Sequence, residues 1–353
     1  MTPRNIFLKI TNESLGWLSA AEGFVFLSGL TAGLVYTYKY LEKGEKTITT
    51  ASRTRAWLIY KYHMLLFLLV ALAVFSTGFL QEYWSVDYAS MLKSPVATTL
   101  LATVLLYQPN FLDILPMYAV FVLFIPIIIR YFERGAYAPV LLVSGALYLL
   151  GTFNAFALLT PIFHNLSEHI NTGFFNLLCW QFIFVIGLYL GSLYYHGKTD
   201  SLQRNSYLFY AAVVLAAPLF IAKFLYIPLG NFDIQYWSDK TYLRPLRLLN
   251  FFAILIIITY IATKFKTWFH YKPICTLGKY SLEVFTFHIV LLILLKPLEE
   301  YLNGLYEIRV SNNFSVYPLG TLLIVAVLLA LFLVPIVKAK RNTNTPPAVK
   351  KAV

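Results

Sequence analysis

Long apolar runs separated by short polar connections dominate the pattern along this chain. They cover roughly 19–40, 57–80, 112–131, 138–160, 175–196, 207–227, 246–263, 280–297 and 317–337. Each run approaches the ~20 residues that a helix needs to cross the hydrocarbon core of a bilayer. The pattern therefore predicts an all-α, polytopic bundle of nine transmembrane helices.

A tenth apolar run is too short to span. Residues 95–107 read PVATTLLATVLLY, a length typical of a re-entrant or interfacial helix. Outside the apolar runs the chain has no segment long enough for a soluble domain. We expect one transmembrane domain over 1–338 and a basic, disordered cytoplasmic tail over 339–353.

Composition supports a bilayer environment. The mean hydropathy is +0.68, and 12% of the 353 residues are charged, against about 25% in an average soluble domain. The formal net charge of +12 raises the question of nucleic acid, because basic proteins often bind it. The distribution of the charges along the chain argues against nucleic-acid binding.

Basic residues gather in alternate connections. The first, third, fifth and seventh connections and the C-terminal tail hold 18 of the 28 lysines and arginines. By the positive-inside rule these segments are cytoplasmic. We therefore expect the C-terminus in the cytoplasm, a lipid bilayer as the main partner, and no nucleic acid.

Several polar residues fall inside the predicted spans or at their ends. These are Glu22, Ser28, Lys61, His63, Gln181, Arg247, Asn250 and His288. Polar side chains at such depths usually face a bundle interior or a wet cavity. Each of these residues could instead have a purely structural role. A histidine can form a hydrogen bond in the protein interior, and an arginine can extend its charged end to the membrane surface. Trp180 can belong to an aromatic belt at the interface. Together they predict a polar cavity reached from both faces.

Other motifs carry less chemistry. The segment HNLSEH offers His164, Glu168 and His169, but its spacing matches neither zinc-protease pattern, so we expect no metal site. There is no P-loop, dinucleotide fingerprint or nucleophile elbow. Three classes of function are therefore left: an enzyme that uses a general base in a membrane cavity, a transporter, or a protein without catalytic activity.

Two pairs of glycines have the spacing of close helix packing. Gly29 and Gly33 lie four residues apart in the first span, and Gly187 and Gly191 do so in the fifth. Small residues at this spacing let two membrane helices approach closely.

Six segments together resemble a known family. SAAEGFVFLSGLTAG, RTRAWLIYKYH, QPNFLDILPMY, FFNLLCWQFIFVIGLYLG, LRPLRLLNF and LGKYSLEVFTFH stand in the order and approximate spacing of the OpgC-type proteins, which belong to the acyltransferase-3-like transmembrane acyltransferases. The resemblance covers about Ser19 to His288. It implies an O-acyltransferase of the bacterial inner membrane with no bound cofactor. Acyl-coenzyme A is its co-substrate, succinyl being the acyl group for OpgC itself, and the acceptor is a glucose hydroxyl of periplasmic glucan.

The resemblance also implies roles for individual residues. The family's base is a histidine in a helix that precedes the stretch matching Asn5–Leu18. That helix is missing from this sequence, and restoring it gives the family's ten spans. Glu22 is expected to orient that histidine or to bind the sugar, and His288 is a second catalytic candidate. The expected substrate-binding residues are Ser28, Gln108, Asp113, Tyr118, Trp180, Gln181, Arg247, Asn250 and Ser281, and the expected acyl-coenzyme A-binding residues are Lys61 and His63.

Two other functions stay open at this point. One is a transporter or flippase of a polar solute, which broken helices and inverted repeats would favour. The other is a catalytically inactive membrane protein that binds a glycan. The sequence does not distinguish the acyl group or the glycan acceptor.

Overall fold

The computed structural model describes residues 13–76, 78–153, 169–224, 233–269, 271–305, 308–311 and 314–343. Over these residues the fold is helical apart from one short antiparallel pair, β1 (Ile308–Ser311) and β2 (Phe314–Val316). The prediction of an all-α bundle is confirmed. The chain forms two compact units. The larger joins Thr11–Phe67 with Asp87–Lys264, and the smaller joins Leu68–Val86 with the chain from Phe265 onward.

Helix α2 (Ala20–Phe75), the first among the described residues, combines the first two predicted spans. It breaks at Gly44, where φ is 77° and ψ is 176°. Glycine reaches this backbone conformation without a steric penalty, whereas residues with a Cβ rarely do. The two limbs of α2 on either side of Gly44 therefore replace the polar loop that the sequence predicts between the spans.

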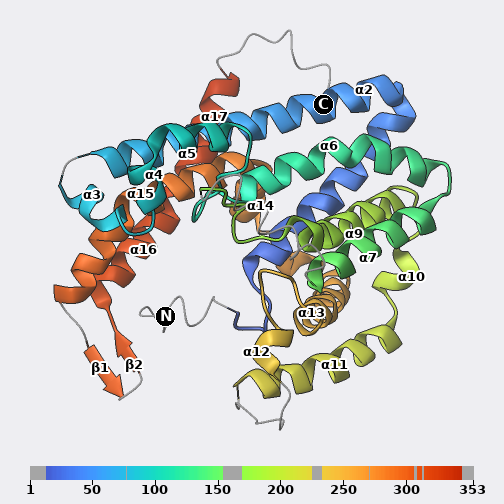
Figure 1. The fold of residues 1–353 in the computed structure, drawn as a ribbon. Coiled ribbons are helices and arrows are strands. Elements are labelled where there is room, and N and C mark those ends of the chain that lie inside the picture. Colours follow the sequence, from blue (N-terminus) through green and yellow to red (C-terminus); the bar gives the residue numbers. More distant parts are fainter. Residues whose placement is uncertain are drawn as a thin grey trace. The chain divides into compact units, whose positions relative to one another are not determined.

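The rest of the larger unit is built from nine further helices. They are α4 (Ala89–Lys93), α5 (Pro95–Thr103), α6 (Ile114–Glu133), α7 (Tyr137–Thr152), α9 (Leu177–Tyr195), α10 (Asp200–Gln203), α11 (Ser206–Phe224), α12 (Ile234–Trp237) and α13 (Pro245–Lys264), as far as the described residues go. Helix α7 packs along α9, and α11 packs along α13 (Figure 1). The short helix predicted over 95–107 is present as α5.

The smaller unit contains α3 (Phe79–Trp84), the 3₁₀ helix η2 (Lys266–Phe269), α14 (Lys272–Lys279), α15 (Ser281–Leu305), α16 (Pro318–Ala330), α17 (Leu333–Thr343) and the β1–β2 pair. Helix α15 packs against α16, and the indole of Trp84 donates to the carbonyl of Ile293 over 3.0 Å. Helix α17 extends past Lys338, and residues 344–353 of the predicted tail lie outside the described residues.

Within the described residues, seven helical stretches are long and apolar enough to cross a membrane. One of them is α2 with its two limbs, and α7 is a shorter apolar helix. An apolar helix is thus present in each of the nine predicted segments. The predicted segment 138–160 continues beyond α7 into residues outside the description.

Helices α2 and α9 approach each other at the two glycine pairs. A Cβ atom at Gly33 would collide with the backbone of Leu188, and one at Gly187 would lie 2.5 Å from the carbonyl oxygen of Phe26. Because these obstacles are backbone atoms, no side-chain movement relieves them. The predicted role of the glycines in close helix packing is confirmed.

Candidate functional site

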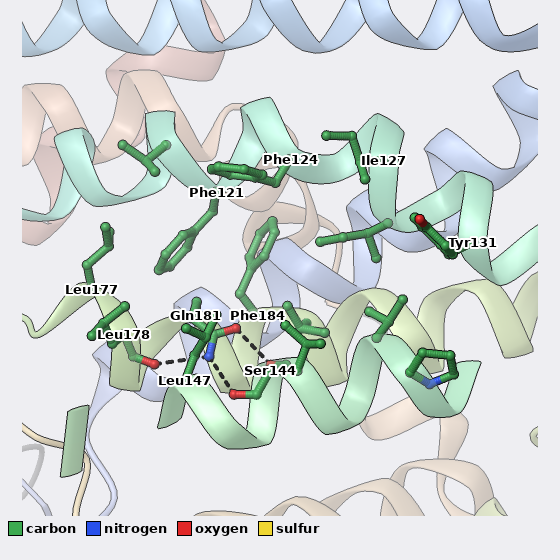
Figure 2. Close-up of a pocket in the computed structure, with 16 residues that line it drawn as sticks. Phe121, Phe124, Ile127, Tyr131, Ser144, Leu147, Leu177, Leu178, Gln181 and Phe184 are labelled. Carbon is green, nitrogen blue, oxygen red and sulfur yellow. Dashed lines mark hydrogen bonds between the residues drawn. The ribbon is translucent and has the colours of Figure 1, made fainter. Parts of the chain in front are cut away.

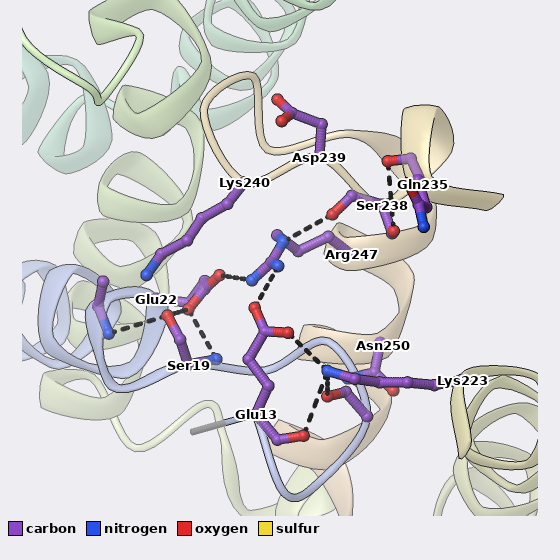
Figure 3. Close-up of polar contacts among 12 residues, drawn as sticks. Glu13, Ser19, Glu22, Lys223, Gln235, Ser238, Asp239, Lys240, Arg247 and Asn250 are labelled. Carbon is purple, nitrogen blue, oxygen red and sulfur yellow. Dashed lines mark hydrogen bonds and ion pairs between the residues drawn. The ribbon is translucent and has the colours of Figure 1, made fainter. Parts of the chain in front are cut away.

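A network of four charged residues lies at one end of the larger unit, with two of them buried and two half-buried (Figure 3). Its centre is the pair of Glu22, in the first turn of α2, and Arg247, in the first turn of α13. The Nη1 of Arg247 donates to Oε1 of Glu22 over 2.7 Å. The exposed fraction of Glu22 is 0% and that of Arg247 is 4%. Both charges are thus compensated within the protein.

Glu13 and Lys223 complete the network. The Nη2 of Arg247 donates to Oε1 of Glu13, and the Nζ of Lys223, near the end of α11, donates to Oε2 of Glu13, each over 2.5 Å. Burial acts to raise the pKa of Glu13, but the hydrogen bonds from Lys223 and Arg247 outweigh it and hold that pKa below its ordinary value. The network therefore holds two carboxylates and two cations, and its formal charges balance.

The turn that enters α2 is tied to the same network. Lys223 also donates to the carbonyl of Gly16 over 2.7 Å, and the amide of Asn250 donates to the carbonyl of Leu15 over 3.0 Å. A Cβ at Gly16, whose φ is +82°, would lie 2.6 Å from the Asn250 side chain. Asn250, a predicted substrate-binding residue, thus holds this turn in place.

Both carboxylate oxygens of Glu22 are engaged. Arg247 occupies Oε1, while Oε2 accepts hydrogen bonds from the Ser19 amide over 2.9 Å and from the Ser19 hydroxyl. These three donors occupy most of the lone-pair directions of the carboxylate, which leaves little room for the proton that a general base removes. The geometry therefore favours a positioning role for Glu22 over a role as the base.

Further polar side chains continue into the bundle beyond Glu22. Tyr118, in the first turns of α6, hydrogen-bonds the side chain of Ser28 on α2. The guanidinium of Arg55, on the second limb of α2, interacts electrostatically with Tyr118 and with the buried Tyr36. The structure thus brings two predicted site residues, Ser28 and Tyr118, together, and the charge of Arg55 acts on Tyr118.

Trp180 and Gln181 face different surroundings although they are neighbours on α9. The Trp180 indole is fully buried and donates to the carbonyl of Thr241 over 3.1 Å. Gln181 instead faces α7, where Ser144 donates to its Oε1 over 2.7 Å and its Nε2 donates to the carbonyl of Ser144 over 2.8 Å. These contacts leave Gln181 little capacity to bind a sugar.

Gln181 lines an apolar pocket of about 580 Å³ between α6, α7 and α9 (Figure 2). Phe121 and Phe124 enter it from α6, and Phe184 enters it from α9. The Gln181–Ser144 pair is closed on itself, so the pocket offers hydrocarbon rather than hydrogen bonds. It suits an apolar chain better than a sugar.

Gln108 and Asp113 hold a loop. The side chain of Asp113 accepts from the backbone N–H of Phe174 over 2.9 Å. The backbone N–H of Gln108 donates to the carbonyl of Asn171 over 2.7 Å, and its Nε2 donates to the carbonyl of Leu105 over 2.6 Å. Burial raises the pKa of Asp113, and the hydrogen bond from Phe174 offsets part of that rise. A Cβ at Gly173 would collide with Asp113. Both predicted sugar-binding residues therefore have contacts that order the backbone.

Lys61 and His63 do not share a face of α2. Lys61 is exposed and lies over the ring of Trp57, 5.6 Å from its centroid. His63 is fully buried, with the backbone of Leu112 and Ala102 beside its ring. Residues two apart on a helix point in different directions. The structure does not bring the two predicted acyl-coenzyme A-binding residues together.

The remaining predicted residues lie elsewhere. Ser281 and His288 are on α15 of the smaller unit, Ser281 exposed and His288 half-buried. His164 and Glu168 fall outside the described residues. In the described part of the chain no cluster of histidine, cysteine, aspartate and glutamate side chains could hold a metal ion.

Three residues of this region escaped the sequence reasoning. Glu13 lies in the segment before the first apolar run, where a charge draws no attention. Lys223 is the only charged residue of the predicted span 207–227, and an ionisable residue within a span is a signal for function. Arg55 lies among other basic residues, and nothing in the local pattern separates it from them.

Apolar spans that surround a charge-balanced network, with a buried ion pair at its centre, define a multi-pass membrane protein with a polar site in its helix bundle. A family model described as OpgC protein matches residues 2–334, so the chain belongs to the OpgC family. Membership in this family implies an acyltransferase of the membrane. No curated protein and no solved structure matches the chain.

Proposed function

We propose that the protein is a membrane O-acyltransferase that transfers an acyl group, succinyl, from acyl-coenzyme A to hydroxyls of a periplasmic glucan. The observation that carries the proposal is the family match over residues 2–334. The basic connections support a cytoplasmic C-terminus in a bacterial inner membrane and an inner surface that attracts an anionic donor.

The reaction defines what the site has to supply. The acceptor hydroxyl attacks the thioester carbonyl and gives its proton to a base, the C–S bond breaks, and coenzyme A leaves as the thiolate. The carbonyl oxygen carries negative charge in the transition state, and donors aimed at it lower the barrier. The hydroxyl of Tyr118, which lies near the side chain of Ser28 on α2, is the proposed donor, and the positive charge of Arg55 acts on the same tyrosine.

The charged network supports the site from one end. Arg247 fixes Glu22, and Glu22 accepts from Ser19 at the start of α2. Ser28 follows Glu22 on the same limb of α2, so the ion pair sets the position of the helix that carries Ser28. The catalytic role of His288, on the smaller unit, and the contacts of Lys61 and His63 with acyl-coenzyme A stay predictions of the family resemblance.

The test compares two tyrosines of α6. Tyr118 interacts with Ser28 and Arg55, whereas Tyr131 is exposed and lines the apolar pocket. The protein is expressed from its own gene, and transfer of labelled succinyl from succinyl-coenzyme A to glucan is measured in membranes. Loss of one oxyanion donor lowers kcat by about 10²-fold or more. We expect that loss for Tyr118→Phe and the full rate for Tyr131→Phe.

Two results would contradict this proposal at different levels. Equal rates for the two variants would remove Tyr118 from the reacting centre and leave the enzyme class intact. No transfer to glucan by the unaltered protein would overturn the enzyme class. Uptake of a polar solute by vesicles that carry the protein would then favour a transporter.

A further inference from the structure

Arg244 is buried with hydrogen-bond donors that have no partner. It lies on the loop between α12 and α13, and its exposed fraction is 6%. Its Nε and Nη1 atoms are shielded from solvent and make no hydrogen bond. These two nitrogens carry three of the five N–H donors of a guanidinium. Because a buried charge without a counter-charge is strongly unfavourable, this position calls for an anionic partner.

The loop that carries Arg244 is anchored by two neighbouring helices. Trp180 of α9 donates to the carbonyl of Thr241 over 3.1 Å, and Tyr148 of α7 donates to the carbonyl of Leu243 over 2.9 Å. Both bonds use backbone oxygens of the loop and leave the guanidinium uninvolved. The loop thus holds Arg244 in one place before any ligand arrives, which lowers the entropic cost of binding.

Aromatic rings hold the face of the guanidinium. Its central carbon lies 3.7 Å from the ring centroid of Tyr236 and 5.5 Å from that of Tyr242. Stacking of this kind stabilises a cation through the face of the ring and leaves the N–H groups, which lie in the guanidinium plane, free to bond. The arrangement fixes the orientation of the donors as well as their position.

The charged neighbours are committed to other groups. Asp239, on the same loop, accepts from the backbone N–H of Tyr242 over 3.0 Å, and it hydrogen-bonds neither the Nε nor the Nη1 of Arg244. Arg247, three residues further on, is paired with Glu13 and Glu22. No carboxylate of the described ranges hydrogen-bonds the Nε or Nη1 of Arg244.

We propose that Arg244 anchors a binding site for an oxyanion, a carboxylate or a phosphate group, carried by a ligand that reaches this end of the larger unit. Arginine is the side chain best matched to such groups, because its N–H donors fit their oxygens in charge and geometry. A ligand of this protein would therefore carry an anionic group that binds Arg244. The site stands on the contacts of Arg244 alone and does not require acyl transfer.

The test measures the effect of anions on thermal unfolding. The protein is purified in a maltoside detergent, which carries no phosphate, and titrated with succinate, with inorganic phosphate and with chloride at matched ionic strength. A ligand that binds only the folded state raises the Tm in a saturable way. We expect a saturable rise with succinate or with phosphate and none with chloride. The oxyanion that acts identifies the group as a carboxylate or a phosphate.

Variants separate a binding role from a structural one. Arg244→Gln removes the charge, Arg244→Lys keeps it without the planar donors, and Arg204→Gln removes an exposed arginine as the control. We expect the apparent affinity to fall at least about tenfold in R244Q and to fall in R244K, with no change in R204Q. The proposal is overturned if neither oxyanion raises the Tm of the unaltered protein, or if R244K binds as tightly as that protein.

Discussion

The guanidinium of Arg247 donates to the carboxylate of Glu22 over 2.7 Å, and the two residues are 225 positions apart in the chain. The pair joins the first turn of α2 to the first turn of α13, and neither side chain has appreciable contact with solvent. Loss of Arg247 leaves Glu22 buried without its counter-charge, whereas loss of Glu22 leaves Arg247 paired with Glu13 alone.

This pairing predicts strong non-additivity between Glu22 and Arg247. We expect Arg247→Gln to lower the free energy of unfolding by about 3 kcal/mol or more, and Glu22→Gln to lower it by less, because Arg247 then keeps its ion pair with Glu13. The double variant should lose less than the sum of the two by about 0.5–3 kcal/mol. Denaturant unfolding of the four proteins in detergent measures the cycle.

A partly exposed pair of the same chain is the control for this cycle. The ammonium of Lys296 lies 3.8 Å from the carboxylate of Glu300 on the same helix. Exposed helix pairs of this spacing contribute only about 0.3–0.5 kcal/mol. We expect a small coupling between K296Q and E300Q. Additive effects at Glu22 and Arg247 would show that the buried pair does not act as a unit.

The contact of α2 with α9 predicts opposite effects for two glycines on one helix. A Cβ at Gly33 meets the Leu188 backbone, while a Cβ at Gly23 has no heavy atom within 4 Å. We expect Gly33→Ala to lower the free energy of unfolding by about 1–3 kcal/mol. Gly23→Ala should be neutral or stabilising by up to about 1 kcal/mol, because alanine favours the helix over glycine. Equal Tm values for the two variants would contradict the close approach.

The hydrogen bonds of Glu13 predict a pH dependence of stability. The pKa of Glu13 lies below its model-compound value of 4.5, because the bonds from Lys223 and Arg247 outweigh burial. A carboxylate with a lowered folded-state pKa contributes stability that is fully present above the unfolded pKa and is lost as pH falls through the folded pKa. We expect Glu13→Gln to lower the Tm at pH 7, and the difference from the unaltered protein to shrink below about pH 4.5. A difference that is constant between pH 7 and pH 4 would show that the ion pairs contribute nothing.

The apolar runs allowed the helices of the fold to be predicted, because the length of a span follows from the bilayer. The break in α2 was harder to predict from the sequence. Gly44 lies within the charged stretch LEKGEK, which predicts a loop, and helix propensity alone does not show that the chain stays helical up to the glycine and beyond it. The role of the glycine pairs could be predicted because small residues four positions apart lie on one face of a helix and allow another helix to approach closely.

The site was predicted as a set of residue types rather than as contacts. Glu22 and Arg247 were both singled out because charges are costly within a span, but the sequence does not state which charges meet. Gln181 was named for the same reason and proved to be satisfied by Ser144. Only three-dimensional packing shows whether the partner of a polar group is a side chain of the protein or remains to be supplied by a ligand.

The two cysteines of the chain provide a test of membrane orientation. Cys179 is buried in α9, whereas Cys275 is exposed on α14, next to a lysine-rich connection that the positive-inside rule places in the cytoplasm. A membrane-impermeant maleimide should therefore label the protein in inside-out vesicles and leave it unlabelled in right-side-out vesicles. Cys275→Ser should abolish the labelling, because a buried thiol is inaccessible to the reagent. Labelling of Cys275 in right-side-out vesicles would reverse the orientation. Acyl-coenzyme A in the cytoplasm would then face the acidic loops instead of the basic ones, and the proposed entry of the donor from the basic side would be wrong.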